Sequence, residues 1–126
     1  MFGYQGKLLH VNLTDRHLEI HSLDQNLLDD YIGGVGLGTK ILFEETTPDT
    51  DPLGQENVLI AFTGPFTATR VPSSGRHHLV ARSPQTGLLG ETNVGGSCDF
   101  KLQKSDYHGL LVPGKASSPV SLWPHN

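Results

Sequence analysis

The chain of 126 residues is long enough for one domain with one hydrophobic core and too short for two such domains. Its 36% hydrophobic and 17% charged residues exclude a disordered polar tract, and no apolar run approaches the about 20 residues of a membrane-spanning helix. The formal net charge of −4 is opposite to the basic balance typical of nucleic-acid-binding domains. The N-terminus has no secretory signal, so we expect a cytoplasmic protein that binds neither nucleic acid nor membrane.

The N-terminal half predicts a β-hairpin, two helices and a buried strand. Residues 4–24 alternate around the turn "NLTDR", a pattern typical of a β-hairpin. Asp24 is a suitable N-cap for a short amphipathic helix that ends at Gly33 and Gly34. A second helix is expected over residues 36–45, and the continuous apolar run "NVLIAFTG" predicts a buried strand.

The C-terminal half predicts mainly strands and loops. The expected elements are a strand "HHLVARS", a turn "SPQT", a loop "LLGETNVGG", a helix in "SCDFKLQKSD" capped by Ser97, and a final hairpin of "YHGLLVPGK" and "PVSLW". Strands and helices do not alternate along the chain, so we expect a strand-rich α+β fold with a few short helices. We assign residues 1–126 to one domain.

The segment "GGVGLGTK" (residues 33–40) is rich in glycine but matches neither common nucleotide-binding motif. Gly38 is followed by Thr39 and then Lys40, whereas a phosphate-binding loop needs Lys directly after the glycine. Thr39 also stands where the dinucleotide fingerprint needs its third glycine. Two interpretations remain: a helix N-terminus whose free N–H groups meet an anion, or a helix corner where glycine allows close packing.

Residues 73–96 contain two glycine-bearing bends with polar neighbours. In "SSGRHH", Gly75 exposes the backbone, and Arg76 offers a planar fork of N–H donors to a phosphate or a heterocycle edge. In "TNVGG", Asn93 tolerates a left-handed backbone, and Gly95 and Gly96 allow close approach. Backbone carbonyls of this bend suit a hard cation such as Mg²⁺. A surface arginine at a strand start and a plain turn are the structural alternatives.

Residues 70–90 contain three arginines, Arg70, Arg76 and Arg82, and no acid. This local positive charge favours a small anion rather than a nucleic acid as the partner. His77 and His78 are adjacent, so on a strand they face opposite sides and are poorly placed to chelate one metal ion.

The remaining reactive side chains identify no catalytic group. Cys98 is the one cysteine of the sequence, which excludes an internal disulfide and a four-cysteine zinc or iron–sulfur site. The sequence has no Gly-x-Ser-x-Gly elbow, which argues against a serine hydrolase.

Several segments occur in the order found at the N-terminus of aldehyde:ferredoxin oxidoreductases, which are tungsten or, in some members, molybdenum pterin enzymes. The segments are "GYQGKLLHVNLT", "IGGVGLGTKIL", "DPLGQENVLIAFTGPFTAT", "SSGR", "SPQTG", "TNVGG" and "GLLVPGKASSPVSLW". The chain resembles this family over nearly its whole length without an obvious insertion. No single segment is specific for this family, but the combination of these segments at these intervals is a strong signal of the resemblance.

The resemblance implies a fold, cofactors and binding residues. It implies a domain of short helices packed on twisted antiparallel sheets, on which two pterin dithiolenes lie with one metal between them. It implies that Arg76 contacts the pterin next to the iron–sulfur cluster and that Gly95 and Gly96 lie against the cofactor. The backbone carbonyl of Asn93 would help to bind a Mg²⁺ ion that bridges the pterin phosphates.

The sequence also departs from the family pattern, while both glycine-bearing bends are intact. The departures are Val35 for an arginine, Lys101 for an acid, Asp106 and His108 within the family's Gly-Tyr-Asp-Gly, and Cys98 and Phe100 at positions usually small or aromatic in another order. We expect them to affect fine geometry and substrate preference.

The resemblance implies a part of an enzyme that oxidises aldehydes to carboxylic acids with ferredoxin as the electron acceptor, and a possible homodimer. Because the chain has one cysteine, the [4Fe–4S] cluster, like the substrate channel, would need further domains of a full-length enzyme. We therefore expect the 126 residues to be inactive alone. The alternative is a stand-alone, non-catalytic remnant that binds a phosphorylated small molecule or a partner subunit.

Overall fold

The computed structural model describes residues 3–123, which form strands and short helices. In chain order the elements are β1 (Lys7–Asn12), β2 (His17–Ser22), α1 (Gln25–Asp30), α2 (Val35–Glu45), β3 (Leu59–Thr63), β4 (Arg76–Arg82), β5 (Leu89–Gly95), α3 (Cys98–Lys104) and β6 (Gly109–Val112). The longest of these helices, α2, has 11 residues, and no described helix has the length and apolarity that crossing a bilayer requires.

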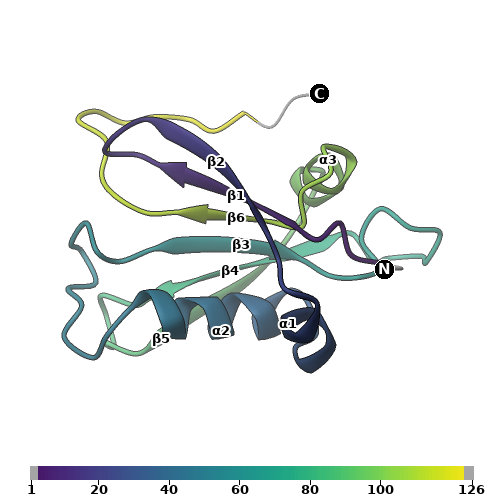
Figure 1. Ribbon diagram of the computed structural model, residues 1–126, viewed down its shortest axis with the longest axis horizontal. Helices are drawn as coiled ribbons and strands as arrows, with labels where there is room; N and C mark the ends of the chain where they lie inside the picture. The colour runs from purple at the N-terminus through teal and green to yellow at the C-terminus, as the bar shows by residue number, and fades with distance from the viewer. Residues whose placement is uncertain (1–2, 124–126) are drawn as a thin grey trace.

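The described strands form one six-stranded sheet in the order β2-β1-β6-β3-β4-β5. Neighbouring strands are antiparallel except β1 and β6, which are parallel. Helices α1 and α2 cover one face of the sheet, and α3 and the C-terminal segment lie on the other face (Figure 1). The predicted α+β class is confirmed; the sheet is single and mixed, because β6 enters between β1 and β3.

The hairpin and the two helices predicted for the N-terminal half are present, and hydrogen bonds between residues close in sequence stabilise them. At the β1–β2 turn, Oδ1 of Asn12 accepts hydrogen bonds from the backbone N–H of Thr14 and Asp15, at 2.9 and 3.1 Å. Asp24 caps α1, since its Oδ1 accepts from the N–H of Asn26 at 2.6 Å. Gly34 separates the two helices with a φ of +72°, a conformation that favours glycine.

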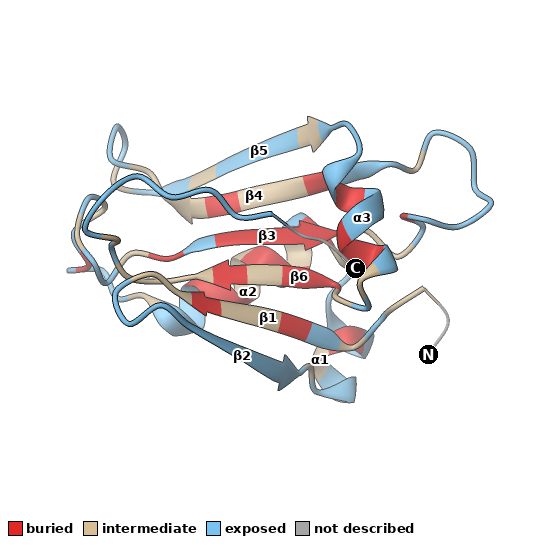
Figure 2. Cartoon of the chain, turned by 90° about the horizontal axis from the view of Figure 1, so that it is seen from above, coloured by how far each residue is buried: buried red, intermediate tan, exposed pale blue. Residues whose placement is uncertain are grey.

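The hydrophobic core lies between α2 and the central strands. Its buried members are Leu8, Leu28, Leu37, Ile41, Leu42, Val58, Ile60, Phe62, Val80 and Leu111. Gly38 lets α2 approach the sheet closely, because a Cβ there would lie only 2.8 Å from Cγ2 of Val80. Figure 2 shows the buried residues concentrated in the central strands, whereas β2 and β5 are mostly exposed.

Two predictions for the C-terminal half were wrong. The segment expected to be a loop forms strand β5, which pairs with β4 through seven residues. Its sequence "LGETNVG" is polar because β5 is an edge strand with largely exposed faces. The expected final hairpin is absent from the described residues, since 119–123 form no strand. Both edges of β6 are already paired, with β1 and with β3, so no edge remains for such a partner.

The face opposite α2 is only partly covered. Helix α3 and residues 121–123 border an apolar groove of about 430 Å³ over the β2-β1-β6 part of the sheet. Its lining residues are Leu9, Val11, Leu18, Ile20, Leu102, Ser105, Tyr107, Leu110, Ser121, Leu122 and Trp123. Trp123, at its rim, remains 77% exposed.

Candidate cofactor-binding site

The residues predicted to bind a cofactor come together at one end of β4 and β5. β4 begins at Arg76 and β5 ends at Gly95, and these two residues are register partners in the antiparallel pair. A hollow of about 400 Å³ lies beside this end, between the loop before β4 and the start of α3. Its lining residues are Ala68, Thr69, Val71, Ser73, Ser74, Gly75, Gly96, Ser97, Asp99 and Phe100.

The main chain is open at the end of β5. Apart from the glycine itself and its chain neighbours, no heavy atom of residues 3–123 lies within 4 Å of the position that a Cβ would take at Gly95 or Gly96. Gly96 also has a φ of +132°, which L side chains rarely adopt. Gly75 differs, because a Cβ there would lie 3.2 Å from Oδ2 of Asp99. Glycine at 95 and 96 therefore leaves backbone groups accessible to a ligand, whereas glycine at 75 serves packing.

A buried carboxylate lies in the wall of this hollow. Asp99 is fully buried, and neither of its oxygens has a hydrogen-bond partner within the described residues. Asp99 and His77 also line a smaller apolar cavity of about 170 Å³, and Nδ1 of His77 likewise lacks a described partner. Buried acceptors are usually hydrogen-bonded, often to an ordered water molecule or a bound group, so this corner is a candidate position for such a partner.

Arg76 and Asn93 contact each other directly. Nη1 of Arg76 donates a hydrogen bond to Oδ1 of Asn93 at 3.0 Å. Sequence reasoning missed two further residues of this contact. Nδ2 of Asn93 lies 3.0 Å from Nε2 of His78, and Nδ1 of His78 lies 2.6 Å from Oε1 of Glu91. An assignment of residues 89–95 as a strand would have revealed them, because residues two apart on paired strands then share a face.

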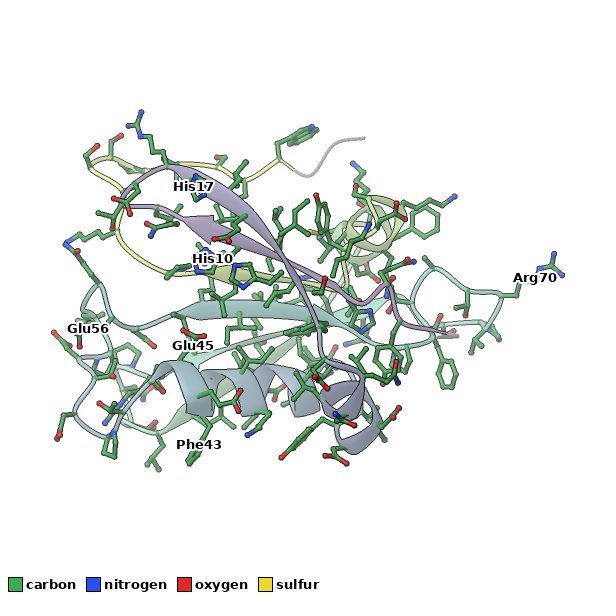
Figure 3. The ribbon with its side chains drawn as sticks, in the orientation of Figure 1. His10, His17, Phe43, Glu45, Glu56 and Arg70 are labelled. Atoms are coloured by element: carbon green, nitrogen blue, oxygen red, sulfur yellow. The ribbon has the colours of Figure 1, made fainter. Side chains whose placement is uncertain are left out.

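The three arginines of residues 70–90 do not form one anion site. Arg70 lies at the tip of the loop before β4 and points away from the body of the molecule (Figure 3). Arg82 lies at the other end of β4 from Arg76, roughly 20 Å away along a strand of seven residues. Its guanidinium donates to the carbonyls of Gly87, at 3.0 Å, and Thr47, at 2.6 Å, so Arg82 ties loops together.

Three of the four glycines in residues 33–40, Gly33, Gly34 and Gly38, serve packing, which favours the second of the two interpretations left open by the sequence. A Cβ at Gly33 would lie 2.9 Å from the carbonyl oxygen of Thr63, and one at Gly34 would lie 2.9 Å from Cδ2 of His78. Several N–H groups that an anion would need are already bonded. The N–H of Gly33 donates to the hydroxyl of Tyr4, and the N–H of Gly34 donates to the carbonyl of Thr63.

A buried polar network lies next to these glycines. Gln103 donates through Nε2 to Oγ1 of Thr63, at 2.8 Å, and to Nδ1 of His108, at 3.1 Å. Oγ1 of Thr63 in turn donates to the carbonyl of His108. Burial lowers the pKa of His108 from 6.5 to about 4. The imidazole is therefore neutral at physiological pH, and the network holds α3, β3 and the start of β6 together.

The structure is thus an α+β domain in which open main chain, a guanidinium and a hollow occur at one end of the sheet, and this end is the candidate ligand-binding site. The family model for "Aldehyde ferredoxin oxidoreductase, N-terminal domain" matches residues 8–126. The chain belongs to this family, as its sequence motifs predicted.

Relatives of several kinds share this domain. The "Tungsten-containing aldehyde ferredoxin oxidoreductase" of Pyrococcus abyssi is 37% identical over 126 residues, which are 100% of this chain and 21% of that protein. The "Aliphatic sulfonate oxidoreductase, WOR-like subunit" of Pyrococcus furiosus is 38% identical over 130 residues, covering 100% of this chain and 20% of that protein. The chain thus spans about a fifth of the length of the curated relatives it matches.

A solved structure has the same fold. The active-site complex BamBC of benzoyl coenzyme A reductase, in complex with 1,5-dienoyl-CoA, matches with a TM-score of 0.90 and 29% sequence identity. The match covers 92% of this chain and 18% of the solved chain.

Proposed function

We propose that this chain is the N-terminal cofactor-binding domain of a tungsten-dependent aldehyde:ferredoxin oxidoreductase. The observation that carries the proposal is the bond between Arg76 and Asn93, which lies beside the open main chain of Gly95 and Gly96. These four residues would bind a tungstopterin cofactor. No catalytic side chain is assigned within the chain.

The names of the relatives favour a cofactor-binding rather than a substrate-binding role. They refer to an aldehyde, an aliphatic sulfonate and benzoyl coenzyme A, which are chemically unlike. A domain that all of them share is best suited to what they have in common. Aldehyde as the substrate and ferredoxin as the electron acceptor are therefore taken from the aldehyde ferredoxin oxidoreductases alone.

The chemistry of a pterin suits this end of the sheet. Its ring edge carries many hydrogen-bond donors and acceptors, so it needs backbone groups that no side chain obstructs. Arg76 makes one described side-chain hydrogen bond and so has further N–H groups for a ring edge or a phosphate. The unpaired carboxylate of Asp99 borders the hollow beside this end of the sheet, which Gly96 also lines.

A Mg²⁺ ion and an iron–sulfur cluster need different ligands: oxygen atoms for Mg²⁺ and thiolates for the cluster. β5 is an edge strand, so part of its backbone carbonyls point away from β4. The carbonyl of Asn93 would be one oxygen ligand of Mg²⁺, together with cofactor phosphates and water. A [4Fe–4S] cluster needs several thiolates, and Cys98 is the single cysteine, so its ligands lie outside these residues. Oxidation of an aldehyde to a carboxylic acid is the chemistry that the tungsten centre supplies when bound.

The test compares two arginine variants of the intact protein, produced anaerobically with tungstate. Arg76→Ala removes the guanidinium at the site, whereas Arg16→Ala removes an exposed guanidinium in the β1–β2 turn. Tungsten and pterin per polypeptide are measured after extended dialysis. Loss of a charge-assisted hydrogen bond of about 1.5 to 3 kcal/mol weakens binding by roughly tenfold or more, so Arg76→Ala should lose cofactor and Arg16→Ala should retain it.

Equal tungsten and pterin contents in both variants would remove Arg76 from the site. If the unaltered protein instead carries no pterin but retains a phosphorylated small molecule, the stand-alone binding remnant is the correct assignment.

A further inference from the structure

Four side chains form a continuous hydrogen-bonded chain across β4 and β5. Glu91, His78, Asn93 and Arg76 are joined in that order by contacts of 2.6, 3.0 and 3.0 Å. His78 and Asn93 are direct register partners, and Arg76 and Glu91 each lie two residues from one of them. All four side chains therefore share the face of the sheet that carries α2.

The donor and acceptor roles along this chain follow from its two ends. A guanidinium only donates hydrogen bonds, so Oδ1 of Asn93 must face Arg76 and the amide NH₂ must face His78. Nε2 of His78 is then the acceptor, and the imidazole proton lies on Nδ1. That proton is donated to the carboxylate of Glu91, which in its ionised form only accepts.

Packing restricts the imidazole as well. The side chain of His78 is 23% exposed, and its Cδ2 lies so close to the start of α2 that a Cβ at Gly34 would be 2.9 Å away. The ring thus lies between the N-terminal end of α2 and strand β5. Each member of the chain is oriented by its neighbour, and the last member is the guanidinium.

We propose that His78 and Glu91 are positioning residues for Arg76 and Asn93. This inference rests on the proposed function of Arg76. Glu91 fixes the tautomer of His78, His78 fixes the amide orientation of Asn93, and the amide oxygen holds the guanidinium in place. Without this row of hydrogen bonds, the side-chain amide of Asn93 is free to turn its NH₂ toward Arg76. Two hydrogen-bond donors would then face each other.

The experiment compares carboxylate variants of the intact, cofactor-loaded protein. Glu91→Leu removes the hydrogen bond to His78, whereas Glu91→Gln still offers an oxygen to Nδ1 of His78. Glu19→Leu is the matched control, because Glu19 contacts His21, at 3.3 Å, on the opposite edge strand β2. The rate of tungsten and pterin loss on dialysis is measured, together with the midpoint of thermal unfolding and a crystal structure of each variant.

Glu91→Leu should lose cofactor about threefold to tenfold faster, the range expected for one hydrogen bond, and the crystal structure should show a displaced Arg76 guanidinium. Glu91→Gln should restore retention to within about twofold, and Glu19→Leu should leave it unchanged. In an Arg76→Ala background, Glu91→Leu should have no further effect, because the two act through one contact.

The outcomes separate this inference from the proposed function. If Arg76→Ala loses cofactor but Glu91→Leu retains it with Arg76 in place, the positioning role is refuted and the site stands. A loss in Glu91→Leu that Glu91→Gln does not restore, accompanied by a lower unfolding midpoint, would also refute it. If Arg76→Ala retains cofactor, the proposed function itself fails.

Discussion

His108→Gln is expected to flatten the pH dependence of the free energy of unfolding. The imidazole of His108 is fully buried, with its ring centroid 4.8 Å from that of Tyr4 and 6.0 Å from that of Phe62. Burial lowers its pKa from 6.5 to about 4. In the unfolded chain the pKa returns to its ordinary value, so between these two pH values the unfolded state binds a proton that the folded state does not.

The hydrogen bonds around His108 are consistent with the neutral form of the imidazole that its burial favours. The hydroxyl of Thr63 donates to the carbonyl of His108, so it can only accept from Gln103, which must then present its NH₂. The same NH₂ faces Nδ1 of His108, so this nitrogen is an acceptor and the proton lies on Nε2. A second proton on Nδ1 would oppose the amide donor, and Nε2 has no partner among the described residues to stabilise the charge.

The sign and size of the effect follow from linkage. The contribution is fully present above pH 6.5 and is lost as the pH falls towards about 4. At about 1.4 kcal/mol per pH unit, the gap between 6.5 and about 4 corresponds to about 3 kcal/mol. Most of this loss, about 2 to 3 kcal/mol, should be reached by about pH 4.5.

The assay is urea unfolding of the unaltered chain, His108→Gln and His17→Gln at several pH values from about 7.5 to about 4.5. Titratable groups that all three proteins share contribute equally to the unfolding free energies, so their contributions cancel in the comparison. The difference in unfolding free energy between the unaltered chain and His108→Gln should shrink by about 2 to 3 kcal/mol as the pH falls. His17 is exposed on β2, so His17→Gln should follow the unaltered chain. Parallel profiles for the unaltered chain and His108→Gln would refute the reasoning.

Three further predictions concern stability and can be checked by the same unfolding assay at neutral pH. Gly38→Ala should destabilise the chain by about 1 to 3 kcal/mol, because the new Cβ would lie 2.8 Å from Val80, whereas Gly36→Ala, with open space on the same helix, should stabilise it by about 0.5 to 1 kcal/mol. Leu37→Ala should cost about 3 kcal/mol or more, since Leu37 is 0% exposed in the core. Asp24→Ala should cost about 1 kcal/mol by removing the cap of α1.

Local signals in the sequence were sufficient for most elements of the fold. The hairpin turn at Asn12, the cap at Asp24 and the apolar run of β3 each depend on residues close in sequence, and all are present in the structure. The position of β6 between β1 and β3 could not be predicted from such local signals. Its parallel pairing with β1 joins Leu8 to Gly109, which are about a hundred residues apart, and no local pattern encodes such a contact.

Strand β5 shows a different limit. Prediction of strands relies on alternating apolar residues, and an edge strand with exposed faces has little need of them. The segment "LGETNVG" is extended because β4 offers it a row of backbone partners, from Arg76 opposite Gly95 to Arg82 opposite Leu89. The same omission concealed His78 and Glu91, whose contact depends on this register.

The predicted binding residues came from the family resemblance and from two glycine-bearing bends, and the structure brings Arg76 and Asn93 into contact. Their role in binding stays a prediction.

Glycine content alone could not separate these bends from the glycines at and before α2, because the surroundings of the glycines differ between the two places. At Gly34 and Gly38 an added Cβ would strike a neighbour within 3 Å, so glycine there allows close packing. At Gly95 and Gly96 an added Cβ would meet no described neighbour within 4 Å, so packing among these residues gives no reason for glycine at either position. At Gly96 the backbone conformation supplies a reason, whereas at Gly95 the access of a ligand to the main chain stays a prediction.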